Sequence, residues 1–473
     1  MLFISDEFFV FLILALLASV VAPTGAVRRY GVLLFCVWFY ASWSLPFMGL
    51  LAANIVADYF LALAIHASTS ERGRFGLVSA SVAMNLGMLG TFKYAGFLAQ
   101  AANDGFVLLG TGWSVPVPEL ILPLGISFYV FQAISYTVDV YRGLLAPTRD
   151  LPKLATFILF FPHLVSGPIV RAAEILPQLD RLQRSPALDD LLVGAKDFVL
   201  GFGRKVVFAD NFAVLADATF AAPGRFGSVD LGVGLVAYAF QIYFDFSGYS
   251  QMAVGLARMF GIHFPDNFDS PYISRSLQEF WRRWHISLSR FLRDYLYIPL
   301  GGSRAGTART LFALSATMLI GGFWHGANWT FVVWGAIHGV GQAVAWSYRR
   351  FWRGPVHARF WDSRAGGATG WVLTMATVLV AWVFFRAPDL GSAQEYLVRL
   401  LGFTNGTQRL DVSGPQLALA AAAVLVHVVA FARPGLQVPW PRTAFGQGLM
   451  VGAGYLGCVA VKAADAPFIY FNF

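Results

Sequence analysis

Apolar stretches of about 18 residues or more recur from one end of this 473-residue chain to the other. A helix that crosses a bilayer needs about 20 residues at a rise of 1.5 Å each, so each stretch is long enough for one crossing. Only 13% of the residues are charged, against about 25% in an ordinary soluble domain. The sequence therefore predicts an all-α, polytopic membrane protein with roughly 10–13 helical spans, accompanied by interfacial and re-entrant helices.

The formal net charge of +8 does not indicate nucleic-acid binding, because the basic residues lie in short loops between apolar stretches. Such clusters mark the cytoplasmic side of a membrane protein, and Arg28 and Arg29 then place the N-terminus outside. The first stretch, 8–21, follows acidic rather than basic residues, so we interpret it as a retained span and not a signal peptide. Cys36 and Cys458 have no metal-ligand spacing, and neither a disulfide framework nor a metal site is indicated.

Two segments depart from a simple span. The run 153–171 is apolar but contains Pro162, Gly167 and Pro168, which predicts a broken or re-entrant segment, buried in protein or lining a cavity. Between 275 and 300, arginines alternate with aromatic residues, which predicts an amphipathic helix at the cytoplasmic interface. The segment 100–118 contains Gly and Pro but no Lys or Arg, and is expected to be an outer loop.

Histidines supply the chemistry that the sequence offers, since it contains no phosphate-binding loop, serine-hydrolase elbow or zinc-protease motif. A helix over 310–323 lifts His325 roughly 24 Å from the basic loop at Arg309, deep in a hydrocarbon core of about 30 Å. Nearby glycines allow close backbone approach, and Trp324 and Trp329 are expected to form bulky walls. A neutral imidazole there can act as general base in acyl transfer, or it can simply bond across helices.

Other ionisable residues are weaker candidates. His285 follows two arginines on the interfacial segment, where a solvated or headgroup-contacting role is the simpler interpretation. If 326–346 is one helix, His338 lies about 20 Å from His325, too far for the same proton transfer, and is assigned a structural or cavity-lining role. For Asp245 and His163 a structural role is favoured, which for Asp245 includes pairing with a cation.

These segments resemble a known family. FWRRWHISLSRFLRDYLYIPLGG followed by FWHGANWTFVVWGAIHG is similar to the membrane-bound O-acyltransferases, and 123–143, 160–171 and 241–262 also resemble the bacterial alginate O-acetyltransferase branch. The likeness covers residues 120–345. It divides the chain into N-terminal transmembrane helices (1–119), a catalytic core (120–345) and C-terminal transmembrane helices (346–473).

The resemblance implies how such a protein works. Helices would surround a central tunnel in the bacterial inner membrane. The catalytic residues would be His325, as general base, and His285, at a second polar position of the family, which would orient or polarise the acyl donor. Acetyl-CoA would be the donor substrate, with no bound cofactor. Its phosphates would be attracted by Arg282, Arg283, Arg290 or Arg293, although arginines on an interfacial helix more often contact lipid phosphates, so no donor-binding residue is assigned. The acceptor would be an exported polysaccharide such as alginate, reached through a periplasmic acetyltransferase partner. The alternatives are a transporter or flippase, or acylation of a lipid, a protein or teichoic acid.

Overall fold

The computed structural model describes residues 3–352, 354–432, 440–461 and 468–469, without the side chains of 355–358 and 430–431. In this part of the chain the secondary structure is helical, and the only β-type pairing is one isolated bridge between Phe226 and Gln408. The all-α prediction is confirmed. The chain forms two compact units, and it passes between them within α10, within α12 and again between Pro265 and Asp266.

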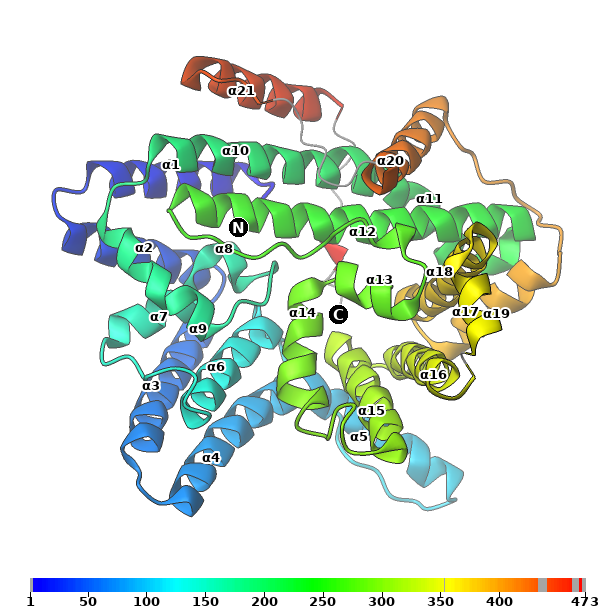
Figure 1. Ribbon diagram of the computed structural model, residues 1–473, viewed down its shortest axis with the longest axis horizontal. Coiled ribbons are helices and arrows are strands. Elements are labelled where there is room, and N and C mark those ends of the chain that lie inside the picture. The colour runs from blue at the N-terminus through cyan, green and yellow to red at the C-terminus, as the bar shows by residue number, and fades with distance from the viewer. Residues whose placement is uncertain (1–2, 353, 433–439, 462–467, 470–473) are drawn as a thin grey trace. The chain divides into compact units, whose positions relative to one another are not determined.

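Unit 1 comprises Met1–Val199 and Tyr249–Pro265. Its helices, coloured from blue to green in Figure 1, are α1 (Asp6–Val21), α2 (Gly25–Ala41), α3 (Leu45–Ala67), α4 (Glu71–Leu89), α5 (Ala95–Leu108), α6 (Ile126–Tyr141), α7 (Leu151–Leu159), α8 (Phe161–Leu164), α9 (Ala172–Ile175), most of α10 (Leu188–Gly203) and the end of α12 (Ser228–Met259). A π-helical turn, Gly90–Tyr94, joins α4 to α5, and a 3₁₀ segment, Leu176–Gln183, follows α9.

Three helices of unit 1 are joined by buried polar side chains. Ser81 on α4 donates to Asp58 on α3 across 2.6 Å, and Asn85 donates to the other carboxylate oxygen at 2.9 Å. Ser81 also contacts the hydroxyl of Thr137 on α6 at 2.9 Å. Buried polar groups that satisfy one another in this way fix the register of neighbouring helices.

The broken segment predicted at 153–171 is present. Helix α7 ends at Leu159, α8 lasts for four residues with Pro162 in its first turn, and Gly167 has φ of +136°. Residues 156–170 are buried in protein, one of the two settings in which irregular backbone is tolerated at membrane depth. The predicted outer loop at 100–118 begins later than expected, because no proline interrupts the chain before Pro116 and α5 continues to Leu108.

Unit 2 comprises Leu200–Gly248 and Asp266–Phe473. Its helices are α11 (Asp210–Ala221), most of α12 (Ser228–Met259), α13 (Leu277–Arg283), α14 (Ile286–Leu292), α15 (Thr307–His325), α16 (Trp329–Phe351), α17 (Pro355–Asp362), α18 (Arg364–Arg386), α19 (Leu390–Leu401), α20 (Gly414–Ala432) and α21 (Ala444–Ala460). Shorter turns are the π-helical Arg204–Ala209 and Arg293–Tyr297 and the 3₁₀ Pro223–Arg225 and Pro271–Ile273.

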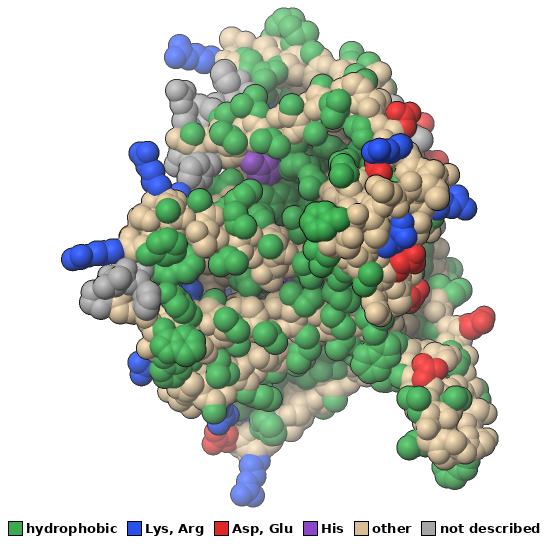
Figure 2. All heavy atoms as spheres, turned by 90° about the vertical axis from the view of Figure 1, so that its right-hand side faces the viewer, with side chains coloured by type: hydrophobic (Ala, Val, Ile, Leu, Met, Phe, Trp, Pro, Cys, Tyr) green, Lys and Arg blue, Asp and Glu red, His purple; other side chains and the backbone are tan. Residues whose placement is uncertain are grey.

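Four helical stretches among the described residues are long and apolar enough to cross a membrane, and two apolar helices are shorter. The four are Leu45–Ala67, Glu71–Leu108, Ser228–Met259 and Arg364–Arg386; the shorter two are Gly414–Val429 and Ala444–Ala460. On the face shown in Figure 2, hydrophobic side chains cover much of the middle and most charged side chains lie toward the edges. A polytopic membrane protein is thereby confirmed, while the number of 10–13 spans and the central tunnel stay predictions.

The two units are defined by contacts within the chain, whereas the three predicted sections, 1–119, 120–345 and 346–473, were drawn from resemblance and hydropathy. The units therefore do not test those boundaries.

Candidate active site

His325 is the last residue of α15. The helix ends there because Gly326 adopts an extended backbone with φ of −162°. The imidazole is 4% exposed and meets three aromatic rings edge-on: Trp324 at 5.0 Å, Trp334 at 5.1 Å and Phe385 at 5.2 Å between ring centroids. Burial against rings excludes bulk water from the imidazole, as expected for a group that handles a proton inside a membrane.

Glycines bring α15 and α16 into close contact beside His325. A Cβ added at Gly335 would lie 2.6 Å from the carbonyl oxygen of Met318, and one added at Gly322 would meet the backbone of α16. The two helices form a hairpin across Gly326–Asn328, whose Asn328 side chain caps α16 at the backbone N–H of Thr330 (3.0 Å). The predicted close backbone approach is confirmed, and it places the ring of Trp334 against His325.

His285 lies at the junction between α13 and α14, where it adopts a left-handed backbone with φ of +43°. Such a conformation is strained for a residue with a Cβ and is often found at functional sites. The predicted single amphipathic helix over 275–300 is therefore wrong: two short helices meet at His285, and a π-helical turn follows Leu292. Aromatic burial overrides the helical periodicity here, since Phe280, Trp281 and Trp284 are all buried.

Asn267 holds this junction in place. Its backbone oxygen accepts from Ile286 N at 2.9 Å, and its side-chain Oδ1 accepts from the backbone N–H of Ser287 at 3.1 Å and from the Ser287 hydroxyl at 2.8 Å. The same Oδ1 lies 3.2 Å from Nδ1 of His285. His285 is fully buried, so the solvated role favoured for it from the sequence does not apply.

Trp324 connects the two candidate histidines. Its ring centroid lies 6.3 Å from that of His285 and 5.0 Å from that of His325. Trp334 makes a second connection, from His325 at 5.1 Å to His338 at 4.7 Å. We refer to His285, Trp324, His325, Trp334 and His338 as the histidine–aromatic cluster; all five belong to unit 2.

His338 is nearer to His325 than the sequence indicated. Both histidines contact Trp334, so their ring centroids cannot be farther apart than those two contact distances combined, about half of the expected 20 Å. The estimate failed because α16 begins at Trp329 and folds back along α15 instead of continuing away from His325. The His338 Nδ1 accepts a hydrogen bond from Nε1 of Trp281 at 3.3 Å.

A pocket lies beside the cluster in unit 2. Its volume is about 590 Å³, and Arg282, Arg290 and Arg293 line it together with Trp281, the donor to His338. Arg283, the fourth arginine considered from the sequence, does not line this pocket; it pairs with Asp269 at 2.8 Å and Glu279 at 3.1 Å.

Asp245 forms part of a buried ionic triad with Lys205 and Asp210. The Lys205 ammonium lies 2.8 Å from Asp245 and 2.7 Å from Asp210, and all three side chains are at most 2% exposed. The second oxygen of Asp245 accepts from the backbone N–H of Ile469 at 2.7 Å. The structural role favoured for Asp245, with a cationic partner, is consistent with this geometry.

His163 belongs to unit 1, where it is buried on α8 among Phe157, Phe160 and Phe264. No group of three or more His, Cys, Asp or Glu side chains suitable for a metal ion occurs among the residues that the structure describes.

Sequence reasoning missed three members of the site's surroundings and misplaced one. Asn267, Trp334 and Phe385 were not singled out. Trp334 and Phe385 are apolar residues within helices and give no local signal that they face a catalytic group. Asn267 contacts residues 18 to 20 positions later in the chain. Trp329, expected to form a wall, is 51% exposed at the first position of α16.

These features define a multi-pass helical membrane protein with a buried, aromatic-walled histidine centre, suited to proton transfer away from bulk water. A family model for the membrane-bound O-acyltransferases matches residues 144–386, a range that contains the whole histidine–aromatic cluster. The chain belongs to the membrane-bound O-acyltransferase family, and it is an acyltransferase.

Two relatives named for O-acetyl transfer are similar in sequence over most of the chain. It is 41% identical to the "Probable alginate O-acetylase" of Azotobacter vinelandii, over 92% of this chain and 85% of that protein. It is 34% identical to the peptidoglycan O-acetyltransferase of Helicobacter pylori, over 92% and 90%. The teichoic acid D-alanyltransferase of Streptococcus thermophilus is also 34% identical, but over only 47% of this chain and 57% of that protein.

Proposed function

We propose that this protein transfers an acetyl group from acetyl-CoA on the cytoplasmic side of the bacterial inner membrane toward an exported polysaccharide such as alginate. A periplasmic acetyltransferase is its proposed partner, which would place the acetyl group on the polymer. The observation that carries the proposal is the burial of His325 between Trp324 and Trp334 inside the family-matched region. The acetyl group is favoured because relatives named for O-acetyl transfer match over nearly the whole chain.

His325 is proposed as the general base. The imidazole takes the proton of an acceptor hydroxyl as its oxygen attacks the thioester carbonyl. The new C–O bond forms, the C–S bond breaks, and the imidazolium returns the proton to the departing thiolate. Histidine suits both halves of this exchange because its unperturbed pKa of about 6.5 lies near physiological pH.

His285 is proposed to orient the acyl donor or the acceptor. Asn267 Oδ1 is fixed as an acceptor by the backbone N–H of Ser287, so a hydrogen bond from His285 requires the proton on Nδ1. In the neutral ring, Nε2 then carries a lone pair, and this buried atom has no partner among the described residues. Such an atom accepts a hydrogen bond, which favours orientation of a substrate N–H or O–H over polarisation of a carbonyl.

The arginine-lined pocket beside the cluster is the proposed donor site. CoA carries several phosphates, and the guanidinium groups of Arg282 and Arg290 on its wall match that charge. Trp281, on the same wall, contacts His338 and Trp334 of the cluster, so a donor bound here has a short route to the reaction centre. The pocket volume of about 590 Å³ is within the usual range for small-molecule sites.

The proposal is tested with membrane vesicles whose cytoplasmic face is outward. Radiolabelled acetyl-CoA is added, and free CoA and acetylated polysaccharide are measured for wild type, His325→Ala and His66→Ala at equal membrane levels. His66 is an exposed control on α3 of unit 1. We expect His325→Ala to lower the rate by about a hundredfold or more, the usual contribution of a general base, and His66→Ala to have no effect.

Other results would overturn the assignment. Normal acetylation by His325→Ala would remove His325 from the mechanism. Export of substrate without any acetyl donor would favour the transporter or flippase. Release of D-alanine instead of acetate from the product would favour the activity named for the teichoic acid relatives.

A further inference from the structure

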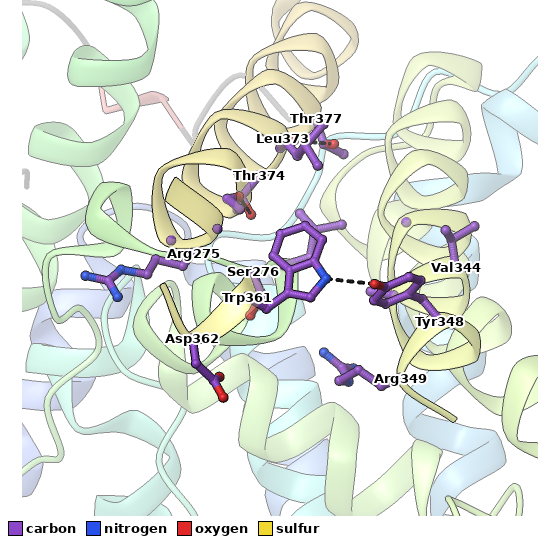
Figure 3. A pocket seen from close by; sticks show the side chains of 16 residues that line it. Arg275, Ser276, Val344, Tyr348, Arg349, Trp361, Asp362, Leu373, Thr374 and Thr377 are labelled. Atoms are coloured by element: carbon purple, nitrogen blue, oxygen red, sulfur yellow. Dashed lines mark hydrogen bonds between the residues drawn. The ribbon is translucent and has the colours of Figure 1, made fainter. Parts of the chain in front are cut away.

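A second pocket of unit 2 lies apart from the histidine–aromatic cluster, between α16, α17 and α18. Its volume is about 500 Å³, and the segment 275–277 closes one side of it. Figure 3 shows Trp361 of α17 in the middle of this pocket, with Arg349 and Asp362 toward one end and Leu373 and Thr377 toward the other. None of the residues that line it belongs to the cluster or to the proposed donor site.

One end of this pocket presents an apolar wall. Leu277, Val344, Ala345 and Leu373 contribute aliphatic side chains. The hydroxyl of Thr374 donates to Gly370 O in its own helix (2.7 Å), so this threonine adds little polarity to the pocket wall. Thr377 behaves alike, donating to Leu373 O at 2.8 Å. The pocket thus offers hydrocarbon contact along the membrane-spanning helix α18.

Trp361 closes the middle of the pocket without adding an exposed polar group. Its Nε1 donates to the hydroxyl of Tyr348 at 2.8 Å, which joins α17 to α16 (Figure 3). Glycines make room for this arrangement: a Cβ at Gly370 would lie 2.6 Å from the carbonyl oxygen of Arg275. A largely apolar space of this kind suits an acyl chain better than a compact polar ligand.

Arg275 lines one side of the pocket, and the other end carries the Arg349 guanidinium and the Asp362 carboxylate (Figure 3). This end lies at the Arg364 end of the span Arg364–Arg386, where the chain also carries Arg350 and Arg359. A membrane lipid with its tail along α18 has its headgroup at this end. A phosphate complements the Arg349 guanidinium, and a headgroup ammonium complements the carboxylate of Asp362.

We propose that this pocket binds one membrane phosphatidylethanolamine, with the phosphate at Arg349, the ammonium at Asp362 and an acyl chain along the wall formed by Leu277, Ala345 and Leu373. The site is separate from acyl transfer, because it uses no residue of the proposed reaction centre or donor pocket.

The test measures lipid retained by the full-length protein. Purified protein is exchanged into nanodiscs or mild detergent with an equal mixture of phosphatidylethanolamine and phosphatidylglycerol, and bound lipid is counted by native mass spectrometry. The variants are Arg349→Gln and Asp362→Asn at the headgroup end and Ala345→Phe in the acyl-chain end. Arg350→Gln is the matched control, since Arg350 is the exposed neighbour of Arg349 and does not line the pocket.

We expect one phosphatidylethanolamine per wild-type or Arg350→Gln chain. Arg349→Gln should weaken retention about tenfold, the loss expected for one charge-assisted hydrogen bond. Asp362→Asn should shift the preference toward phosphatidylglycerol, and Ala345→Phe should abolish retention of both lipids while the protein stays monodisperse in size-exclusion chromatography.

Three results would overturn the proposal. If the wild-type protein retains no lipid, phosphatidylethanolamine does not bind in this pocket. Retention by Ala345→Phe equal to wild type would place the lipid elsewhere. Binding of inorganic phosphate or glycerol phosphate, unaffected by Ala345→Phe, would assign Arg349 to a free anion.

Discussion

The Lys205 ammonium lies 2.8 Å from the carboxylate of Asp245 inside unit 2, with both side chains at most 2% exposed. Lys205 comes from the π-helical turn after α10 and Asp245 from the middle of α12, so the pair joins two helices far apart in the sequence. Asp245 also binds the backbone of Ile469 and precedes Phe246, whose ring lies 4.6 Å from that of His285. The pair thus connects the C-terminal segment with the wall of the histidine–aromatic cluster.

This ionic triad predicts an order of stabilities. Lys205→Met leaves two carboxylates buried without their cation, whereas Asp245→Asn leaves Lys205 paired with Asp210. Because an uncompensated buried charge costs about 3–5 kcal/mol, Lys205→Met should lower the melting temperature in detergent much more than Asp245→Asn. Equal melting temperatures for the two variants would show that the triad does not stabilise unit 2.

Asn267 is predicted to control the pH dependence of acyl transfer through His285. Asn267→Asp keeps an oxygen acceptor beside Nδ1 but adds a negative charge, which stabilises the protonated imidazole. If transfer needs neutral His285, the acid limb of the pH–rate profile should move to higher pH. Asn267→Leu should instead lower the rate at every pH. A profile that Asn267→Asp leaves in place would contradict a role for His285 in substrate contact.

The Trp281 indole is predicted to hold His338 neutral, because a ring nitrogen that accepts a hydrogen bond carries no proton. Trp281→Phe removes the donor but keeps most of the aromatic packing. We expect a rate loss of about tenfold or less, far below that of His325→Ala, consistent with a cavity-lining role for His338. A loss as large as that of His325→Ala, at equal membrane levels, would place His338 in the reaction itself.

The donor pocket predicts an effect on substrate affinity alone. Arg282→Gln and Arg290→Gln should raise the KM for acetyl-CoA about tenfold each with little change in kcat, since each removes a charge-assisted contact to a phosphate. Arg304→Gln, an exposed residue outside the pocket, is the matched control. Unchanged KM in both pocket variants would move the donor site elsewhere.

Gly335 is predicted to be required for the packing of α15 on α16. A larger side chain there meets the Met318 carbonyl, so Gly335→Leu should destabilise the protein by about 1–3 kcal/mol or more and reduce activity through Trp334. Gly87→Leu on α4 is the control, because a Cβ at Gly87 meets no atom within 4 Å. Thermal unfolding in detergent measures the difference, and equal melting temperatures would argue against this helix contact.

Much of the helical framework can be read from local patterns. Ser44 and Pro46 mark the start of α3, and Pro162 with Gly167 marks the break after α7, because proline and glycine act on the backbone within a few residues. The interfacial segment could not be read this way. Its 3.6-residue periodicity predicts one helix, but the left-handed turn at His285 is held by Asn267, 18 residues earlier.

The sequence by itself determined that this is a helical membrane protein and that His325 lies at the end of an apolar helix, because hydropathy and helix rise are local properties of the chain. Tertiary structure alone decided which side chains surround that histidine. Trp334 and Phe385 reach His325 because α16 folds back along α15 and α18 packs beside α16, and His338 approaches for the same reason. Helix packing is set by contacts between residues distant in sequence, which no local pattern records.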